Sequence, residues 1–300
     1  MFPKQVVLAA VCMFSVACMG DDLFDEIGQG GGGVGGTVDP GGQGSGNGAS
    51  CLQGVTDFGT RGPFNHRSAN SGRVKIEVPV VPAGCKVPVV HLANGTGASC
   101  FMYGAVLDTL ASHGFIAACY ETTNTGSGVE GLEAIRTVYR NHSDIAGPMI
   151  GSAGHSQGGQ AAFVVQQLAE SEFGAGYKYA GLAMEPASGF GDQPRSGSWR
   201  SVYSRIQSPM FMFSGTADIL VSRTWVSLGF NALNDQVEAY HWSARGATHI
   251  PVPNRVTQEV AVPWFRWKLL GDQNACRAFK NLLGGLTWSE VDSQNVASCQ

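Results

Sequence analysis

The chain has 300 residues, of which 43% are hydrophobic and 14% are charged, so it can bury the core of one α/β domain. The formal net charge is −4 and no cluster of Lys and Arg occurs, which argues against nucleic acid as a partner.

The N-terminus has the pattern of an export signal. Lys4 precedes an apolar run over residues 6–17 that is too short to span a bilayer, so we predict a signal peptide over residues 1–17. Residues 15–18 read Ser-Val-Ala-Cys and resemble the lipobox of bacterial lipoproteins, with Ser where Leu is usual. Two alternatives stay open: lipidation of Cys18, which would tether the protein to a membrane, and ordinary cleavage with release.

Residues 18–50 are predicted to form a flexible linker. More than half of the positions from 28 to 48 are glycine, and such a segment buries too little apolar area to offset its chain entropy. We therefore expect one folded domain over residues 51–300.

Predicted strands and helices alternate along this domain. The strands are expected over 74–78, 87–92, 115–119, 149–154, 179–184, 210–214 and 237–242, and the helices over 101–112, 128–141, the stretch after Ser156, and 260–270. This alternation predicts an α/β fold with a mostly parallel central sheet and helices on both faces. Ligands of such sheets bind beyond the carboxyl ends of the strands.

The strand over 149–154 leads into Gly154-His155-Ser156-Gln157-Gly158, which has the form G-x-S-x-G. A serine in this motif lies on a sharp strand-to-helix turn, where glycines permit strained dihedrals and close backbone approach. The alternative is a plain Gly/Ser turn, since 42 of the 300 residues are glycine. We predict that Ser156 is a nucleophile.

A serine hydroxyl needs an imidazole to take its proton and an acid to orient that imidazole. His249 follows the last predicted strand in a small-residue loop and is the expected base, and Asp218 follows the strand over 210–214 and is the expected acid. Glu185 is the alternative acid. An ordinary histidine pKa predicts activity that rises as the pH passes roughly 6 to 7.

Six other histidines are alternatives to His249 as the base. We expect the side chain of His155 to point away from the nucleophile and His91 to be a strand residue with a satisfied ring. His113 should end a helix, and His66, His142 and His241 lack a matching context.

An oxyanion hole requires two backbone N–H donors. Gln157, which directly follows the nucleophile, is expected to supply one of them. Thr96, in the loop 94–97 after the strand over 87–92, is expected to supply the other.

Apart from Cys18, six cysteines follow the signal peptide, which in an exported chain suggests up to three disulfides, with buried free thiols as the alternative. Cys276 with Cys299, in the tail beyond the last predicted helix, is the leading pair. Cys51 with Cys85 and Cys100 with Cys119 follow by nearness in the inferred topology. The sequence has no C-x-x-C pair or His-rich tract, so no metal site is expected.

Several of these segments together resemble one known family. They are residues 88–96, 110–115, 154–159, 215–218 and 246–249, and the tail that carries Cys276 and Cys299. They resemble the bacterial cutinases and poly(ethylene terephthalate) hydrolases, in the dienelactone-hydrolase-like branch of the α/β-hydrolases. The resemblance implies a Ser156–Asp218–His249 triad, an oxyanion hole at Thr96 and Gln157, hydrolysis of carboxylic esters and no cofactor.

The sequence departs from that family at positions that contact substrate. Thr96 and Gln157 stand where an aromatic residue and Met are usual, and residues 184–190 lack the substrate-clamping Trp. The segment 187–207 is also longer and is expected to cover part of the cleft. We therefore expect a monomeric esterase without a named polymer substrate. A serine peptidase or amidase and a non-catalytic binding domain are the alternatives.

Overall fold

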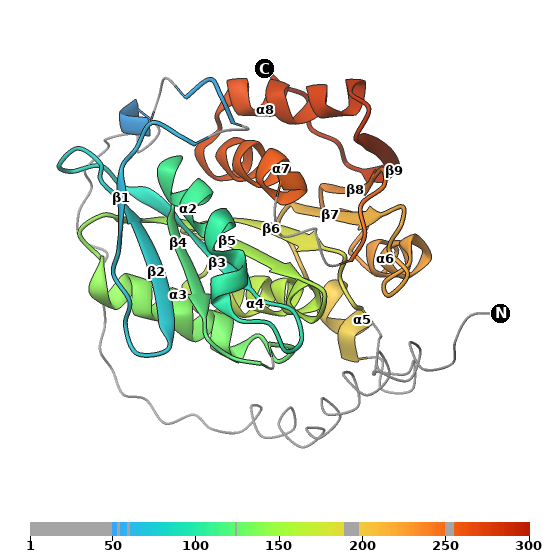
Figure 1. Ribbon diagram of the computed structural model, residues 1–300, viewed down its shortest axis with the longest axis horizontal. Helices are drawn as coiled ribbons and strands as arrows, with labels where there is room; N and C mark the ends of the chain where they lie inside the picture. Colours follow the sequence, from blue (N-terminus) through green and yellow to red (C-terminus); the bar gives the residue numbers. More distant parts are fainter. Residues whose placement is uncertain (1–49, 53–54, 59–60, 124, 189–197, 250–254) are drawn as a thin grey trace. The chain divides into compact units, whose positions relative to one another are not determined.

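The computed structural model describes residues 50–52, 55–58, 61–123, 125–188, 198–249 and 255–300 (Figure 1). The predicted signal peptide over 1–17, Cys18 and nearly all of the predicted linker over 18–50 lie outside the described residues. Among the described residues, none of the helices is both long enough and apolar enough to cross a membrane.

Nine strands form one sheet in the order β1-β2-β4-β3-β5-β6-β7-β8-β9. Their bounds are β1 His66–Ser68, β2 Val74–Pro79, β3 Val87–Ala93, β4 Ile116–Tyr120, β5 Ala146–His155, β6 Lys178–Met184, β7 Met210–Gly215, β8 Ala239–Ala244 and β9 Trp288–Gln294. Pairing is parallel from β4 to β8, whereas β1, β2 and β9 join antiparallel at the edges. The predicted α/β class with a mostly parallel sheet is confirmed, and it is compatible with an α/β-hydrolase.

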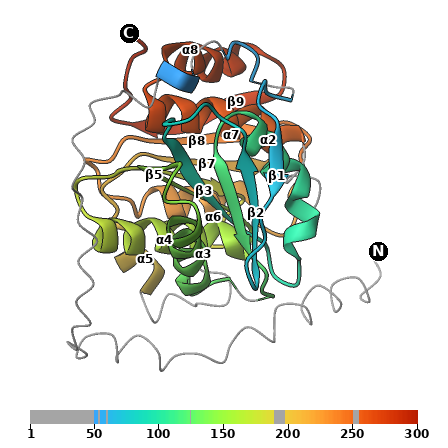
Figure 2. The ribbon, with the colours of Figure 1, turned by 90° about the vertical axis from the view of Figure 1, so that its left-hand side faces the viewer.

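Helices cover both faces of the sheet. They are α2 Gly104–Ser112, α3 Val129–Asn141, α4 Gln157–Phe173, α5 Ser198–Tyr203, α6 Arg223–Phe230, α7 Arg255–Phe265 and α8 Gln273–Asn281, with 3-10 turns η1 Ser50–Leu52, η2 Cys100–Tyr103 and η4 Leu282–Gly284 and the π-helix η3 Arg266–Leu270. Helices α2, α7 and α8 lie on one face, and α3 and α4 lie on the other (Figures 1 and 2). Because both faces are covered, β3 and β7 are buried along their whole length.

Several predicted boundaries of helices and strands differ from the observed ones. The helix expected over 101–112 starts as the 3-10 turn η2, and only its part from Gly104 is α-helical. The helix expected over 260–270 begins at Arg255, is α-helical to Phe265 and continues as the π-helix η3. The strand expected over 237–242 begins at Ala239, because Val237 still closes a turn with Asn234.

The C-terminal tail beyond the last predicted helix contains helix α8 and strand β9. Cys276 lies on α8, and β9 pairs with β8 to extend the sheet. Strand β9 is polar and only partly buried, with the sequence WSEVDSQ, so it has no regular apolar alternation.

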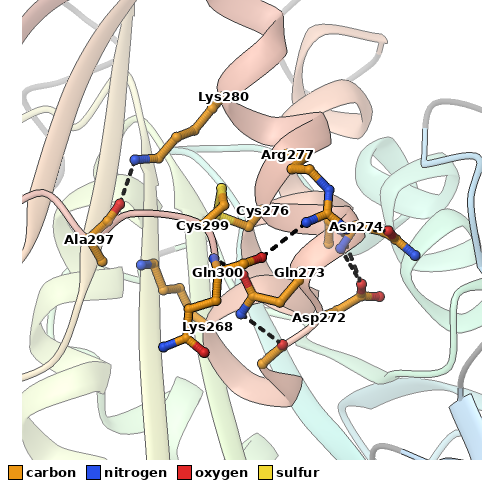
Figure 3. The surroundings of a disulfide bond; sticks show 12 residues. Lys268, Asp272, Gln273, Asn274, Cys276, Arg277, Lys280, Ala297, Cys299 and Gln300 are labelled. Carbon is orange, nitrogen blue, oxygen red and sulfur yellow. Dashed lines mark hydrogen bonds between the residues drawn. A yellow bond between two sulfur atoms is a disulfide. The ribbon is translucent and has the colours of Figure 1, made fainter.

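The six cysteines form three disulfides, Cys51–Cys85, Cys100–Cys119 and Cys276–Cys299. Figure 3 shows the last of these, which joins α8 to the end of the chain. Hydrogen bonds support the same join: Lys280 Nζ donates to the carbonyl of Ala297, and the amide of Gln300 donates to Gln273 Oε1 over 2.8 Å. The C-terminus is therefore held against α8 by one covalent and several polar contacts.

Candidate active site

Ser156 occupies a sharp turn between β5 and α4. Its backbone dihedrals are φ 58° and ψ −120°, a conformation that non-glycine residues rarely adopt. The motif requires glycine at two positions for steric reasons. A Cβ on Gly154 would lie 1.9 Å from the carbonyl oxygen of Gly158, and a Cβ on Gly158 would lie 2.2 Å from the carbonyl oxygen of Ala93. The turn can therefore form only where backbone segments approach without side chains between them.

The three predicted triad side chains meet above the ends of the strands. His249 Nε2 lies 2.9 Å from Ser156 Oγ, and His249 Nδ1 lies 2.8 Å from Asp218 Oδ2. Since Nδ1–H donates to the carboxylate, Nε2 is left to accept the hydroxyl proton of Ser156. All three residues are buried.

Backbone amides orient Asp218. Its Oδ1 accepts hydrogen bonds from the N–H groups of Leu220 (2.8 Å) and Val221 (2.9 Å), which leaves Oδ2 for His249. Burial raises the pKa of Asp218, but the hydrogen bonds from His249 and from these amides outweigh burial, so the pKa is lowered. The carboxylate is therefore ionised while it faces the imidazole.

The pKa of His249 is raised to about 9. Burial opposes the charged ring and lowers the pKa, but the hydrogen bond to Asp218 and the nearby carboxylate of Glu185 raise it by more. An ordinary histidine pKa predicts that activity rises near pH 6 to 7. Two carboxylates beside one imidazole move that expectation to higher pH.

Glu185, the alternative acid, also lies beside the imidazole of His249. Its Oε2 is 3.3 Å from His249 Nδ1, against 2.8 Å for Asp218. The side chain is fully buried, and neither carboxylate oxygen receives a well-formed hydrogen bond from the described residues. The structure therefore brings both candidate acids to one base.

A hydrogen-bond chain that was not predicted links the loop after β3 to the loop of the base. The amide of Gly95 donates to Tyr103 Oη (2.9 Å), Tyr103 Oη lies 2.9 Å from His155 Nδ1, and His155 Nε2 lies 3.0 Å from the carbonyl oxygen of His249. Burial raises the pKa of Tyr103 to about 12 and lowers the pKa of His155, so a protonated phenol faces a neutral imidazole. His155 thus points away from the nucleophile's hydroxyl, as expected. Tyr103 lies in a stretch predicted as ordinary helix and gave no sequence signal.

The two predicted oxyanion residues lie side by side. Thr96 Oγ1 donates to Gln157 Oε1 over 3.3 Å, and Gln157 begins helix α4 directly after the nucleophile. The loop that carries Thr96 is held by Asn94, whose Nδ2 donates to the carbonyls of Ala98 (2.9 Å) and Thr122 (2.8 Å).

The expectation for His91 was wrong in one respect. It lies in β3, as predicted, but its Nδ1 is buried without a hydrogen-bond partner among the described residues. Burial lowers its pKa to about 3, so the ring is neutral in the core.

Metal ligation at this site would compete with its hydrogen bonds. Ligand atoms of His155, Glu185 and His249 lie within 4.8 Å of one another. However, Nδ1 of His249 is bonded to Asp218, and Nε2 of His155 is bonded to the His249 carbonyl. The arrangement suits proton transfer between a hydroxyl and an imidazole better than cation binding.

No family model matches the chain, and no curated protein matches it.

Proposed function

We propose that this protein is a serine hydrolase of α/β-hydrolase type that cleaves carboxylic esters. The observation that carries the proposal is the continuous hydrogen-bonded series Ser156–His249–Asp218, with the serine on a strained strand-to-helix turn. The resemblance to the cutinase and polyester hydrolase family points to the same chemistry.

The proposed reaction has two halves. Ser156 Oγ attacks the ester carbonyl while its proton passes to His249 Nε2, and the tetrahedral oxyanion is met by the backbone N–H groups of Thr96 and Gln157. The intermediate collapses, the carbon–oxygen bond to the alcohol breaks, and His249 returns the proton to the departing alcohol. Water then repeats the sequence on the acyl-enzyme, with His249 as base, and releases the acid and Ser156.

The proposed substrates are carboxylic esters, without a named polymer. The aromatic clamp typical of polyester hydrolases would follow β6, where this chain has Glu185 and Pro186. Aromatic rings favour flat aryl substrates, so we expect weak activity on aromatic polyesters compared with aliphatic esters. The predicted cover of the cleft falls partly on residues 189–197, which lie outside the described residues.

We further propose that the protein works outside the cytoplasm. Three disulfides suit an oxidising compartment, in agreement with the predicted signal peptide. Cys18, the candidate site of lipidation, lies outside the described residues.

Turnover of a short p-nitrophenyl ester by the purified protein tests the function. Ser156→Ala should lower kcat by on the order of 10⁶-fold, because the nucleophile is lost. Ser152→Ala is the matched control: Ser152 is a buried serine of β5, the strand before Ser156. Its hydroxyl donates to the Ala162 carbonyl over 2.9 Å and to Gln166 Oε1 over 2.8 Å, so its variant should keep activity.

Two further measurements separate the alternatives. A fluorophosphonate probe should label wild type and not Ser156→Ala, whereas a non-catalytic binding domain would stay unlabelled. Rates on matched ester and amide substrates distinguish an esterase from a peptidase or amidase. Undiminished ester turnover by Ser156→Ala would remove the proposed function.

A further inference from the structure

Glu185 is a buried carboxylate that the triad does not account for. Its side chain is fully buried, and neither oxygen has a well-formed hydrogen bond from the described residues. Removing an ionised carboxylate from water without such bonds is strongly unfavourable, so a positive charge nearby would stabilise it. Among the described residues, two imidazoles lie within ion-pair distance of it, His249 at 3.3 Å and His155 at 3.7 Å.

The backbone around Glu185 is strained and tightly held. Its φ is 44°, in the left-handed region that disfavours side chains, and its amide donates to the carbonyl of Phe213 over 2.8 Å. On either side, the amide of Ser156 donates to the carbonyl of Met184 (3.0 Å), and the amide of Ala187 donates to that of Ser156 (3.0 Å). The end of β6 is thus bonded directly to the turn of the nucleophile, which fixes where the Glu185 side chain begins.

Strand β7 leaves room for the carboxylate. A Cβ on Gly215 would lie 2.5 Å from Glu185 Oε1 and 2.3 Å from the carbonyl oxygen of Ala247. The carboxylate therefore packs directly on the glycine backbone that precedes Asp218, and any side chain there would displace it.

Of the described groups that face Glu185, His249 is the one that can carry a positive charge. His155, from β5, accepts from Tyr103 at Nδ1 and donates to the His249 carbonyl from Nε2, so its ring is neutral and its one N–H is already used. Asp218, from the loop after β7, approaches the same Nδ1 of His249 that Glu185 approaches. His249 is then the group whose protonation would compensate both carboxylates.

We propose that Glu185 is a positioning residue for the base, a second carboxylate that shares the Nδ1 edge of His249 with Asp218 and stabilises the imidazolium formed when Ser156 gives up its proton. The inference rests on the proposed function. The hydroxyl proton passes to Nε2, the Nδ1 proton stays on the ring, and no bond to Glu185 forms or breaks. In the reactive form of the enzyme His249 is neutral and its positive charge forms as Ser156 attacks, so stabilising that charge lowers the barrier from this form.

The arrangement predicts that Asp218 is less essential than a sole acid would be. In a triad with one acid, an asparagine in its place turns the imidazole to the wrong tautomer and costs about 10⁴-fold in kcat. Here Glu185 can still accept the Nδ1 proton, so the productive tautomer is retained. We expect Asp218→Asn to lose about 10²-fold, and Asp218→Asn with Glu185→Gln to reach the loss of about 10⁴-fold expected of a sole acid.

The test is an NMR titration of the His249 ring, which needs no substrate. Glu185→Gln, nearly isosteric and uncharged, should lower the pKa of His249 by about one unit, a tenfold change in its protonation constant. The pH at half-maximal kcat/KM should fall by the same amount. Glu185→Asp, which retains the charge one methylene further back, should give an intermediate pKa.

Glu170→Gln is the matched control, because Glu170 is a partly buried carboxylate at the far end of α4, bonded to Gln166 and the amide of Gln207. It should leave the pKa of His249 unchanged. Should Glu185→Gln not fold, the downfield Nδ1 proton resonance of His249 in Asp218→Asn decides, since that variant leaves Glu185 intact and should retain the signal.

The proposal is overturned if the pKa of His249 in Glu185→Gln stays within about 0.3 unit of wild type, or if the double variant is no slower than Asp218→Asn. Because the titration reads the imidazole directly, it succeeds or fails independently of ester turnover and of the Ser156→Ala result.

Discussion

At the scale of single residues, the site depends on two strained positions that support each other. Ser156 and Glu185 both have positive φ, 58° and 44°, and such a conformation costs about 1–2 kcal/mol for an L-residue. Their backbones are joined through the hydrogen bond from the Ser156 amide to the carbonyl before Glu185. The strain places a hydroxyl and a carboxylate on opposite sides of His249, which relaxed strand or helix geometry would not do.

The first prediction concerns pH. With the pKa of His249 raised to about 9, kcat/KM should rise across pH 7 to 9 and level off only above it, because the base must be neutral. Stability should change in the opposite sense. The stabilisation from the charged ring is complete below the ordinary pKa of about 6.5 and is lost as the pH rises through about 9.

A pH–rate profile and thermal melts over pH 6 to 10 check both expectations. Activity that is already level at pH 7 would mean that the two carboxylates do not hold the proton on His249.

At the scale of secondary-structure elements, the π-helix η3 joins distant parts of the domain through one buried cation. Arg266 donates to the carbonyl of Leu52 over 2.6 Å, to that of His113 over 3.1 Å and to Asp272 Oδ2 over 2.8 Å. The other oxygen of Asp272 caps helix α8. One guanidinium thus connects the start of the described chain, the end of α2 and the C-terminal helix.

We predict that Arg266→Met destabilises the fold by about 3–5 kcal/mol, because it leaves Asp272 and two carbonyls without their donor. Arg277→Met is the control: Arg277 lies on α8, and its hydrogen bonds are exposed, so its loss should cost at most about 1 kcal/mol. Urea unfolding measures both. If both variants lost the same free energy of unfolding, the buried contacts of Arg266 would contribute no more than the exposed contacts of Arg277.

At the scale of the whole molecule, the sheet positions the site, and the C-terminal segment, α8 and β9, packs against the sheet. The proposed nucleophile follows β5, the proposed acid follows β7 and the proposed base follows β8, so the carboxyl ends of three parallel strands lie at one edge of the sheet. On the face covered by α7 and α8, Trp242 of β8 stacks on Phe279 of α8 with ring centroids 4.3 Å apart. The strand before the base therefore packs directly on the disulfide-bonded helix.

We predict that replacing Cys276 and Cys299 together by Ala lowers the free energy of unfolding by about 3 kcal/mol, since the bond closes a loop with a sequence separation of 23. The triad lies apart from this join, so kcat at 25 °C should stay within a few-fold of wild type. Denaturant unfolding and ester turnover on the same preparation check the pair of expectations. A large loss of kcat at full folding would instead link the C-terminal segment to the site.

The sequence by itself determined what is local in this protein. The alternation of apolar strands and amphipathic stretches predicts the α/β class, because residues on a buried face repeat with the period of their element. The glycines around Ser156 predict the sharp turn, since only glycine tolerates the backbone contacts found at Gly154 and Gly158. Strand β9 was not predicted, because a polar and partly exposed edge strand needs no apolar face.

The tertiary structure decided which side chains share the base. Glu185 and Asp218 follow different strands and were alternatives by sequence, yet both reach the same nitrogen of His249. Tyr103 joins the network from a stretch that resembled ordinary helix. Such convergence depends on strand order and on the space left by Gly215, which are long-range properties that local periodicity does not encode.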